Sequence, residues 1–280
     1  MKICRTVDEM RATVRALRTK GEIGLVPTMG ALHAGHMSLV AQALDENQGV
    51  VTSIFVNPTQ FGDPSDLEKY PRDDDADLAK LEAAGVDAVF LPSVDQIYTD
   101  GDETIVETTG LANVFHGLVR PGHFRGVATV VTKLLNIVGP DRVYFGQKDY
   151  QQLAVIRRMV QDLHMPVMVR DVPTARDTDG LALSSRNARL TPENRAAAPV
   201  LNKALVAAEE ALKGGASIED AADLIKSTIL AEPSADLQAA DFVDAATFDQ
   251  ATGDFRGTIG IMISALFGDI LLIDQREVTR

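Results

Sequence analysis

About the first 175 residues alternate short runs typical of β-strands with helical patterns of ten to sixteen residues. Such alternation constrains the fold strongly, because it is the pattern of βαβ units that build a parallel sheet. The expected strands are Ile23–Val26, Val50–Val56, Val86–Leu91, Arg142–Phe145 and Val167–Val172. The expected helices are His36–Asn47, Asp74–Ala84, Gly126–Val138 and Tyr150–Leu163. We therefore predict an α/β domain with a parallel sheet over residues 1–175.

The pattern of predicted elements changes after about Asn187. Two alanine-rich amphipathic helices are expected, roughly Pro192–Leu212 and Ile218–Leu230, followed by strands near Ala239–Asp244, Thr258–Ala265 and Ile270–Asp274. Helices followed by strands are typical of an α+β arrangement. We assign residues 176–280 to a second, smaller α+β domain that covers the active site.

The charge of the chain limits its partners. Its 280 residues carry 27 basic and 40 acidic side chains, a net charge of −13, which repels polyanions and disfavours nucleic acid or an anionic membrane as a partner. A small anionic substrate therefore needs a local group of cations. One cysteine, Cys4, excludes an internal disulfide, and the longest apolar run, Ile259–Gly268, is shorter than the ~18 residues of a membrane span. With no segment that resembles a signal peptide, we expect a cytoplasmic protein.

The segment Pro27–His36 runs from a predicted strand into a predicted helix. His33 and His36 share a face of its first turn, where unpaired backbone N–H groups and the helix dipole favour an anion such as phosphate. The segment lacks the Gly-Lys-Ser/Thr ending of a P-loop, and a spacing of three with no third ligand makes zinc a weak interpretation. The alternative is that both histidines only cap the helix and pack.

Three further segments near predicted strand ends contain side chains that could bind a substrate. Gln60 follows Pro58, and a neutral amide there suits a hydroxyl or carboxylate, although a solvent-facing loop glutamine is the alternative. The segment Arg120–Gly126 holds two arginines and a histidine, which suits an anion or an ordinary surface turn. Lys148, with Gln152 a turn later, and the Ser184-Ser185-Arg186 segment offer donors for phosphate oxygens, although a simple turn has the same appearance.

The aspartates at positions 73, 74, 75 and 77 begin a predicted helix. Acidic residues at a helix start usually complement the dipole and face water. Asp77 is the member that we consider as a contact for a magnesium ion carried in by ATP.

Five ordered motifs together resemble the pantothenate synthetase family. They are Pro-Thr-Met-Gly-x-Leu-His-x-Gly-His at 27–36, Phe-Val-Asn-Pro-x-Gln-Phe at 55–61, Arg-Pro-Gly-His-Phe-Arg-Gly at 120–126, Phe-Gly-x-Lys-Asp at 145–149 and Leu-Ser-Ser-Arg-Asn at 183–187. His-x-Gly-His alone indicates only the wider nucleotidyltransferase superfamily. Three residues differ from forms frequent in the family: Thr59 and Leu183 stand where methionine is common, and Ala175 where a bulkier residue often sits.

The resemblance implies a Rossmann-like domain, a smaller carboxy-terminal domain, a homodimer, and magnesium-dependent condensation of pantoate with β-alanine using ATP. It implies catalytic roles for His36 as proton donor, His33, Lys148 and Arg186, and pantoate binding by Gln60 and Gln152, with Gln60 also near β-alanine. The implied ATP-binding residues are Met29, Gly30, Ala31, Leu32, His33, Ala34, Gly35, His36, Gly146, Gln147, Lys148, Asp149, Ala175, Leu183, Ser184, Ser185 and Arg186.

Two other functions remain open at this point. A nucleotidyltransferase would leave the nucleotide on a phosphorylated alcohol, give a stable nucleotidyl product and ignore β-alanine. A nucleotide-sensing module would bind ATP and release no pyrophosphate. An aminoacyl-tRNA synthetase is disfavoured, because a chain of net charge −13 shows no basic surface for tRNA.

Overall fold

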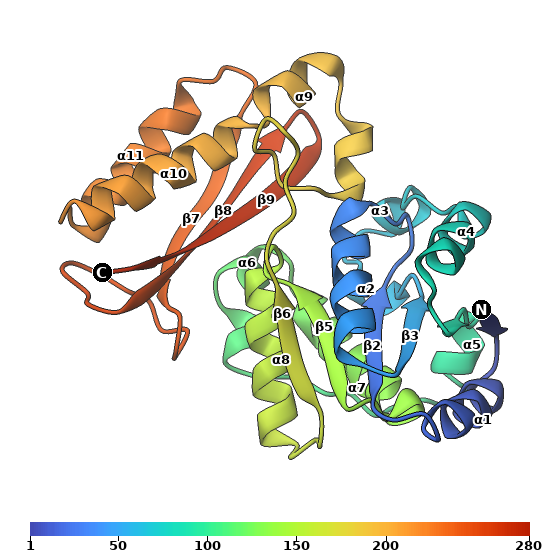
Figure 1. The fold of residues 1–280 in the computed structure, drawn as a ribbon. Helices are drawn as coiled ribbons and strands as arrows, with labels where there is room; N and C mark the ends of the chain where they lie inside the picture. Colours follow the sequence, from blue (N-terminus) through green and yellow to red (C-terminus); the bar gives the residue numbers. More distant parts are fainter. The chain divides into compact units, whose positions relative to one another are not determined.

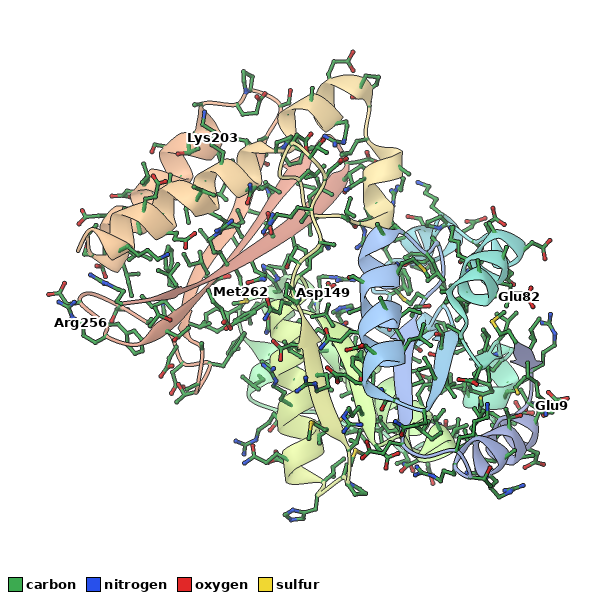
Figure 2. The ribbon with its side chains drawn as sticks, in the orientation of Figure 1. Glu9, Glu82, Asp149, Lys203, Arg256 and Met262 are labelled. Carbon is green, nitrogen blue, oxygen red and sulfur yellow. The ribbon has the colours of Figure 1, made fainter.

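A computed structural model describes all 280 residues. The chain divides into two compact units: Met1–Gly146 with Gln151–Pro173, and Gln147–Tyr150 with Thr174–Arg280 (Figure 1). The short segment Gln147–Tyr150 thus belongs to the second unit, although it lies within the range 1–175 assigned to the first domain from the sequence. Charged side chains such as Glu9, Glu82, Lys203 and Arg256 are exposed and point away from the ribbon (Figure 2).

The first unit is built on a six-stranded sheet whose paired strands are all parallel, as predicted. Its strands are β1 (Lys2–Cys4), β2 (Ile23–Thr28), β3 (Gly49–Ile54), β4 (Ala88–Phe90), β5 (Arg142–Gly146) and β6 (Met168–Val172), in the order β1-β4-β3-β2-β5-β6. Every residue of β3 is buried, as expected for a central parallel strand covered on both faces. The edge strand β1 is an addition to the five strands predicted.

Helices cover both faces of this sheet. They are α1 (Val7–Leu17), α2 (Ala34–Glu46), α3 (Pro64–Glu68), α4 (Asp74–Ala84), α5 (Val94–Ile97), α6 (His116–Val119), α7 (His123–Val138) and α8 (Tyr150–Asp162), with short 3-10 turns η1 (Pro58–Gln60) and η2 (Leu111–Asn113). One apolar core joins α1, α7 and α8 to strand residues such as Leu25, and another joins α2 and α4 to strand residues such as Val26. Neighbouring strand residues serve opposite cores because successive side chains point to opposite faces.

The strand order creates a switch point between β2 and β5. These strands are neighbours, with Gly24 beside Arg142 and Leu25 beside Val143. The chain leaves β2 toward β3 on one side, and β5 has β6 on its other side. Ligands of open parallel sheets bind outside the carboxyl ends of strands at such a point. The segments that follow Thr28 and Gly146 therefore start at the place where a ligand is expected.

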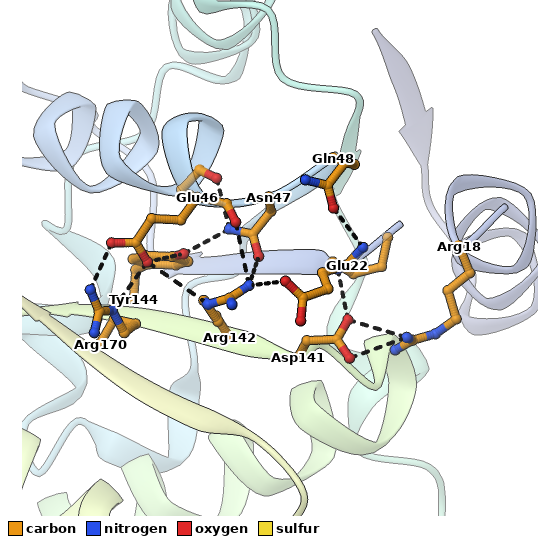
Figure 3. A network of polar contacts seen from close by, with 11 residues as sticks. Arg18, Glu22, Glu46, Asn47, Gln48, Asp141, Arg142, Tyr144 and Arg170 are labelled. Carbon is orange, nitrogen blue, oxygen red and sulfur yellow. Dashed lines mark hydrogen bonds and ion pairs between the residues drawn. The ribbon is translucent and has the colours of Figure 1, made fainter. Parts of the chain in front are cut away.

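The opposite, amino-terminal end of these strands is held by a polar network (Figure 3). Arg170 donates two hydrogen bonds to the Glu46 carboxylate, at 2.8 and 3.1 Å, and Tyr144 Oη donates to the same carboxylate at 2.9 Å. Arg142 contacts Glu22 and Asn47 at 2.6 and 3.1 Å. Burial is the main cause that raises the pKa of Tyr144 to about 12, so its hydroxyl stays protonated.

The second unit contains helices α9 (Pro192–Ala197), α10 (Val200–Lys213) and α11 (Ile218–Leu230), the 3-10 turn η3 (Ser185–Arg189) and an antiparallel sheet of β7 (Asp236–Asp244), β8 (Thr258–Phe267) and β9 (Ile270–Thr279). Its core packs residues of α10 and α11 on one face of the sheet. The predicted α+β class is confirmed. The single helix predicted over 192–212 is wrong, because Pro199 lacks the N–H that an unbroken helix needs.

No helix of this chain is long and apolar enough to cross a membrane.

Candidate active site

The turn after β2 carries the first group of predicted site residues. Thr28 Oγ1 donates to Ser53 O at 2.8 Å and accepts from the Gly30 N–H at 3.2 Å. Gly30 and Ala31 both adopt left-handed backbone, with φ of +81° and +51°. A side chain at Gly30 would also meet Ile54 and Asp77 at 3.2 Å, so this tight turn needs glycine there. The turn brings the chain directly into α2.

His33 and His36 are joined at the start of α2. His33 is the N-cap, so the helix begins at Ala34 and not at His36 as predicted. His33 Nδ1 accepts from the Gly35 N–H at 3.1 Å, His36 Nδ1 accepts from the His33 N–H at 3.3 Å, and the ring centroids are 4.1 Å apart. A neutral ring that accepts at Nδ1 carries its proton on Nε2. Each histidine therefore has Nε2–H as its donor, beside the positive end of the helix dipole.

Asp77 of α4 supports the same turn from beneath. Its side chain is 1% exposed, and its Oδ1 accepts from the Leu32 N–H at 2.8 Å. Lys80 donates to Leu32 O at 2.7 Å and to Asp77 Oδ1 at 3.3 Å. The expectation that the acidic run faces water holds for Asp73, Asp74 and Asp75, which are exposed, and is wrong for Asp77. A buried carboxylate paired in this way holds residues 29–36, called the histidine turn below, to α4.

Gln60 lies in a second polar cluster, on the 3-10 turn η1 after β3. Its side chain is 8% exposed, so the alternative of a solvent-facing glutamine is wrong. Asn57 Nδ2 donates to Gln60 Oε1 at 3.0 Å, and Gln60 Nε2 donates to Met29 Sδ at 3.2 Å. Met29 belongs to the histidine turn, so Gln60 and that turn are neighbours in space.

The segment Arg120–Gly126 packs against the same turn η1. His123 is 9% exposed, and its Nδ1 lies 2.9 Å from Gln60 O, while Arg120 Nη1 lies 3.2 Å from His123 Nε2. A Cβ added to Gly126 would lie 2.5 Å from Thr59 O, so the backbone of α7 approaches η1 more closely than any other residue allows. Of the two arginines, Arg125 is exposed. The alternative of a surface turn with solvated arginines thus fits Arg125, whereas His123 is buried against η1.

The two adjacent glutamines at the start of α8 have different surroundings. Gln151 is 2% exposed, donates to Leu111 O and Val114 O at 2.9 and 2.8 Å, and accepts from the His116 N–H at 3.1 Å. Its amide is consumed by holding the 111–116 loop. Gln152 is half-buried and is the member of the pair whose amide is not committed to this loop.

Lys148 lies in the segment that belongs to the second unit. Tyr150, two residues later, stacks on Phe248 with ring centroids 5.9 Å apart and donates to Glu277 at 2.7 Å. Gly260 of β8 faces the Tyr150 ring so closely that an added Cβ would lie 2.4 Å from it. The small antiparallel sheet thus anchors the Lys148 segment. Lys148 itself is half-buried and Asp149 is exposed.

Ala175 and Leu183 are brought together in the second unit. The Leu183 N–H donates to Ala175 O at 2.9 Å, and Arg176 pairs with Ala182 as an isolated antiparallel bridge. Ser184 caps the turn η3 by accepting from the Arg186 N–H at 3.2 Å. Arg176 fixes this hairpin to β9 through two contacts with the Asp274 carboxylate, at 2.7 and 2.9 Å. The hairpin that leads into Ser184–Arg186 is therefore fixed to β9 by Arg176.

Comparison with known proteins decides the family. The family model for pantoate-beta-alanine ligase matches residues 2–277. A pantothenate synthetase of Herpetosiphon aurantiacus is 49% identical over 276 residues, which cover 98% of this chain and 99% of that protein. This chain belongs to the pantoate–β-alanine ligase family.

Solved structures of pantoate–β-alanine ligases have the same fold. The crystal structure of pantothenate synthetase from Thermus thermophilus matches with a TM-score of 0.94 at 46% identity and covers 100% of both chains. The ligase of Francisella tularensis, complexed with beta-gamma ATP and β-alanine, matches with a TM-score of 0.80 at 36% identity, covering 99% of this chain and 97% of that one. The resemblance stated from the five motifs is therefore confirmed.

For this ligase, the predicted site residues fall in two groups. The histidine turn, Gln60, Gly146 and Gln152 belong to the first unit, and Gln147–Asp149, Ala175 and Leu183–Arg186 belong to the second. Sequence reasoning missed the supporting residues Asn57, Lys80 and Tyr98. Asn57 lies inside the motif at 55–61, so the sequence did contain a signal for it, whereas nothing in the sequence singles out Lys80 or Tyr98. The assigned ATP, pantoate and catalytic roles stay predictions.

Proposed function

We propose that this ligase condenses (R)-pantoate with β-alanine to give pantothenate, AMP and pyrophosphate, and that the site residues named above carry the reaction. The observation that supports this most strongly is the pair of histidines at the start of α2, whose Nδ1 atoms accept from backbone N–H groups, at the switch point of a chain that matches the family model over residues 2–277. Pantoate first attacks ATP to form pantoyl adenylate and pyrophosphate. β-Alanine then displaces AMP from the adenylate.

The first step is an encounter between two anions. The pantoate carboxylate, with a reference pKa of ~4, is ionised at neutral pH and needs no base to attack the α-phosphorus. Its oxygen forms a bond to phosphorus while the bond to the leaving pyrophosphate breaks. We assign His33 and His36 to the phosphoryl oxygens, because N–H donors beside a helix N-terminus stabilise charge that develops there. Lys148 and Arg186 are assigned to the triphosphate as its cationic contacts.

Pantoate is assigned to two neutral amides. Gln60 is buried beside the histidine turn, and Gln152 is the glutamine of its pair that the 111–116 loop leaves uncommitted. A neutral amide binds a carboxylate or hydroxyl without a cation that would weaken the carboxylate as a nucleophile. This division gives the cationic residues to ATP and the amides to the acid.

The second step needs β-alanine as a free amine, because its ammonium form has no lone pair. The nitrogen attacks the adenylate carbonyl, the amide bond forms, AMP leaves with the electron pair of the broken C–O bond, and the nitrogen releases a proton. His36 is assigned as the proton donor of the site. In the neutral form fixed by the contact of Nδ1 with the His33 N–H, its Nε2–H would serve by donating a hydrogen bond to the phosphate oxygens of the departing AMP, while the proton released by the nitrogen passes to solvent.

Magnesium is proposed to arrive with ATP. When bound, it would neutralise charge on the triphosphate. This chain offers little to hold the ion by itself: no group of three or more His, Cys, Asp or Glu side chains converges to bind a metal. Asp77, the residue considered for this role from the sequence, uses Oδ1 for Leu32 and Lys80, and its Oδ2 is buried without a hydrogen-bond partner.

We also propose a homodimer that works in the cytoplasm. The single cysteine, Cys4, is buried and has no disulfide partner, which fits a reducing compartment.

The test follows both half-reactions. The purified protein is mixed with ATP, magnesium and pantoate, and pyrophosphate is followed in a single turnover; β-alanine is then added, and AMP and the amide product are identified by mass spectrometry. We expect pyrophosphate without β-alanine, and AMP with the amide only after its addition. His36→Ala should slow the first phase by at least ~10²-fold. His164→Asn, which changes an exposed histidine just before β6, should leave it unchanged.

Each rival function gives a different result in this assay. A stable nucleotidyl product that ignores β-alanine would indicate a nucleotidyltransferase. ATP binding without pyrophosphate release would indicate a nucleotide-sensing module. A normal single turnover in His36→Ala would remove His36 from the assigned role while leaving the overall reaction intact.

A further inference from the structure

The orientation of the Asn57 amide is fixed by two backbone groups. Asn57 is 1% exposed, and its Oδ1 lies 3.3 Å from the Thr59 N–H while its Nδ2 lies 3.2 Å from Gly126 O. A backbone N–H can only donate and a carbonyl can only accept. Turning the amide over would set donor against donor and acceptor against acceptor in a buried place, which is costly.

The orientation of the Asn57 amide also fixes the orientation of the Gln60 amide. Because Asn57 Nδ2 is a donor, the atom of Gln60 that it meets at 3.0 Å must be the acceptor Oε1. The Gln60 amide nitrogen therefore points the other way, toward Met29 Sδ at 3.2 Å. Sulfur is a weak acceptor and takes one hydrogen of the two on that nitrogen. Gln60 thus keeps one further N–H donor, and not its oxygen, on the side of the histidine turn.

Two hydroxyl groups complete the arrangement on the outer side. Tyr98 Oη donates to Asn57 Oδ1 at 2.8 Å, and Thr59 Oγ1 donates to the same oxygen at 3.0 Å. The Tyr98 ring lies 6.4 Å from the Phe55 ring and 4.9 Å from Lys133 Nζ, which also donates to Ile97 O at 2.9 Å. Burial is the main cause that raises the pKa of the Tyr98 hydroxyl, so it remains a donor at neutral pH.

We propose that Tyr98 is a positioning residue for pantoate: together with Thr59 it holds Asn57, and Asn57 holds the Gln60 amide with its nitrogen toward the substrate. The proposal rests on the proposed role of Gln60. It adds that the group bound by Gln60 is an acceptor, a carboxylate or hydroxyl oxygen of pantoate. The ammonium end of β-alanine, which carries only donors, does not fit there.

The test is a double-mutant cycle. Tyr98→Phe should raise KM for pantoate about 3–10-fold, the scale of one hydrogen bond, and change kcat and KM for ATP less than about twofold. In a Gln60→Ala background, the same substitution should no longer change KM for pantoate. Thr59→Val, which removes the other hydroxyl, should resemble Tyr98→Phe and serves as the second variant if Tyr98→Phe folds poorly.

The control is Tyr144→Phe. It removes a buried tyrosine hydroxyl from the network at the opposite end of the sheet, so Tm should fall while KM for pantoate stays unchanged. A pantoate effect of Tyr98→Phe that persists in full without Gln60, or no effect in either hydroxyl variant, overturns the proposal. Gln60→Ala with normal use of pantoate overturns instead the proposed role of Gln60.

Discussion

At the scale of single residues, the candidate site depends on close contacts that leave no room for a larger side chain. Gly126 is the clearest case, because an added Cβ would lie 2.5 Å from Thr59 O and 2.8 Å from Gln60 Cα. Both atoms are backbone, so η1 or α7 must move to accept a side chain. The same two segments carry the Asn57 contacts with Gly126 O and Gln60. Packing at one glycine therefore sets the position of the Gln60 amide.

Gly126→Ala tests this dependence. Alanine normally favours a helix over glycine by ~1 kcal/mol, so any loss must come from the contact. We expect unfolding free energy to fall by about 1–3 kcal/mol, as in overpacked sites. We expect kcat/KM for pantoate to fall by about 10–100-fold, since small displacements of a binding group reduce rates steeply. Urea unfolding and steady-state kinetics measure both.

Gly110→Ala is the matched control. No heavy atom lies within 4 Å of a Cβ added there. Its stability and kinetics should match those of the parent. Parental kinetics in Gly126→Ala would show that η1 tolerates displacement, and the close approach would then have no role in the site.

At the scale of elements, α2 links the two ends of the sheet. It begins at the His33 cap and ends beside Glu46 and Asn47, which join the polar network at the start of β5 and β6. The hydrogen bond from Arg170 is the main cause that lowers the pKa of Glu46 to about 2, with Gln42 and Tyr144 adding to it. Ionised Glu46 thus stabilises the attachment of α2 to β6.

The pH dependence of this contact follows from the direction in which the pKa of Glu46 is shifted. The pKa of Glu46 is lower in the folded chain than the ordinary 4.5, so its contribution is present above about pH 4.5 and is lost as pH falls toward 2. Glu46→Gln should lower unfolding free energy by about 1–2 kcal/mol at neutral pH. The difference between the two proteins should shrink toward zero near pH 2, as measured by urea unfolding at several pH values.

Glu82→Gln is the comparison for that experiment. Glu82 is an exposed helix residue whose side chain lies 3.7 Å from the amino terminus, and exposed pairs contribute little. Its substitution should change stability by less than about 0.5 kcal/mol at every pH. A constant difference between the parent and Glu46→Gln across pH would contradict the assigned origin of the contact.

At the scale of the whole molecule, charge and assembly are the relevant properties. A net charge of −13 keeps copies of this chain apart unless a specific interface overcomes the repulsion. Exposed apolar side chains, with Leu118 70% and Val119 59% exposed on α6 and Ile3 42% exposed on the edge strand β1, are available for such contacts.

Sedimentation equilibrium tests the proposed homodimer. We expect a mass of twice 30.1 kDa, about 60 kDa, with little change when salt is raised. A mass of 30.1 kDa at every protein concentration would show a monomer and would contradict the homodimer.

Local patterns were enough for most elements and for the family. The alternation of strand and helix patterns predicts the parallel sheet, and five short motifs identify the pantoate–β-alanine ligases. The helix Val7–Leu17 was not predicted, although the capping box of Thr6 and Glu9 at its start is a usable local signal. Two other failures came where the local signal was weak or conflicting. The edge strand β1 has three residues, too few for a visible period. The helix predicted over 192–212 followed an alanine-rich amphipathic pattern across Pro199 and overlooked the break that proline imposes.

By itself, the sequence determined which residue types follow which strands, because periodicity and turn chemistry are local. Only the tertiary structure decided that Asp77 holds Leu32, 45 residues away, that Asn57 meets Gly126, 69 residues away, and that Tyr98 lies over Asn57, 41 residues away. Such contacts depend on strand order and helix packing, which a local pattern does not specify. They fix which end of the Gln60 amide lies toward the histidine turn, and under the proposed role of Gln60 they also set the polarity of the group that it binds.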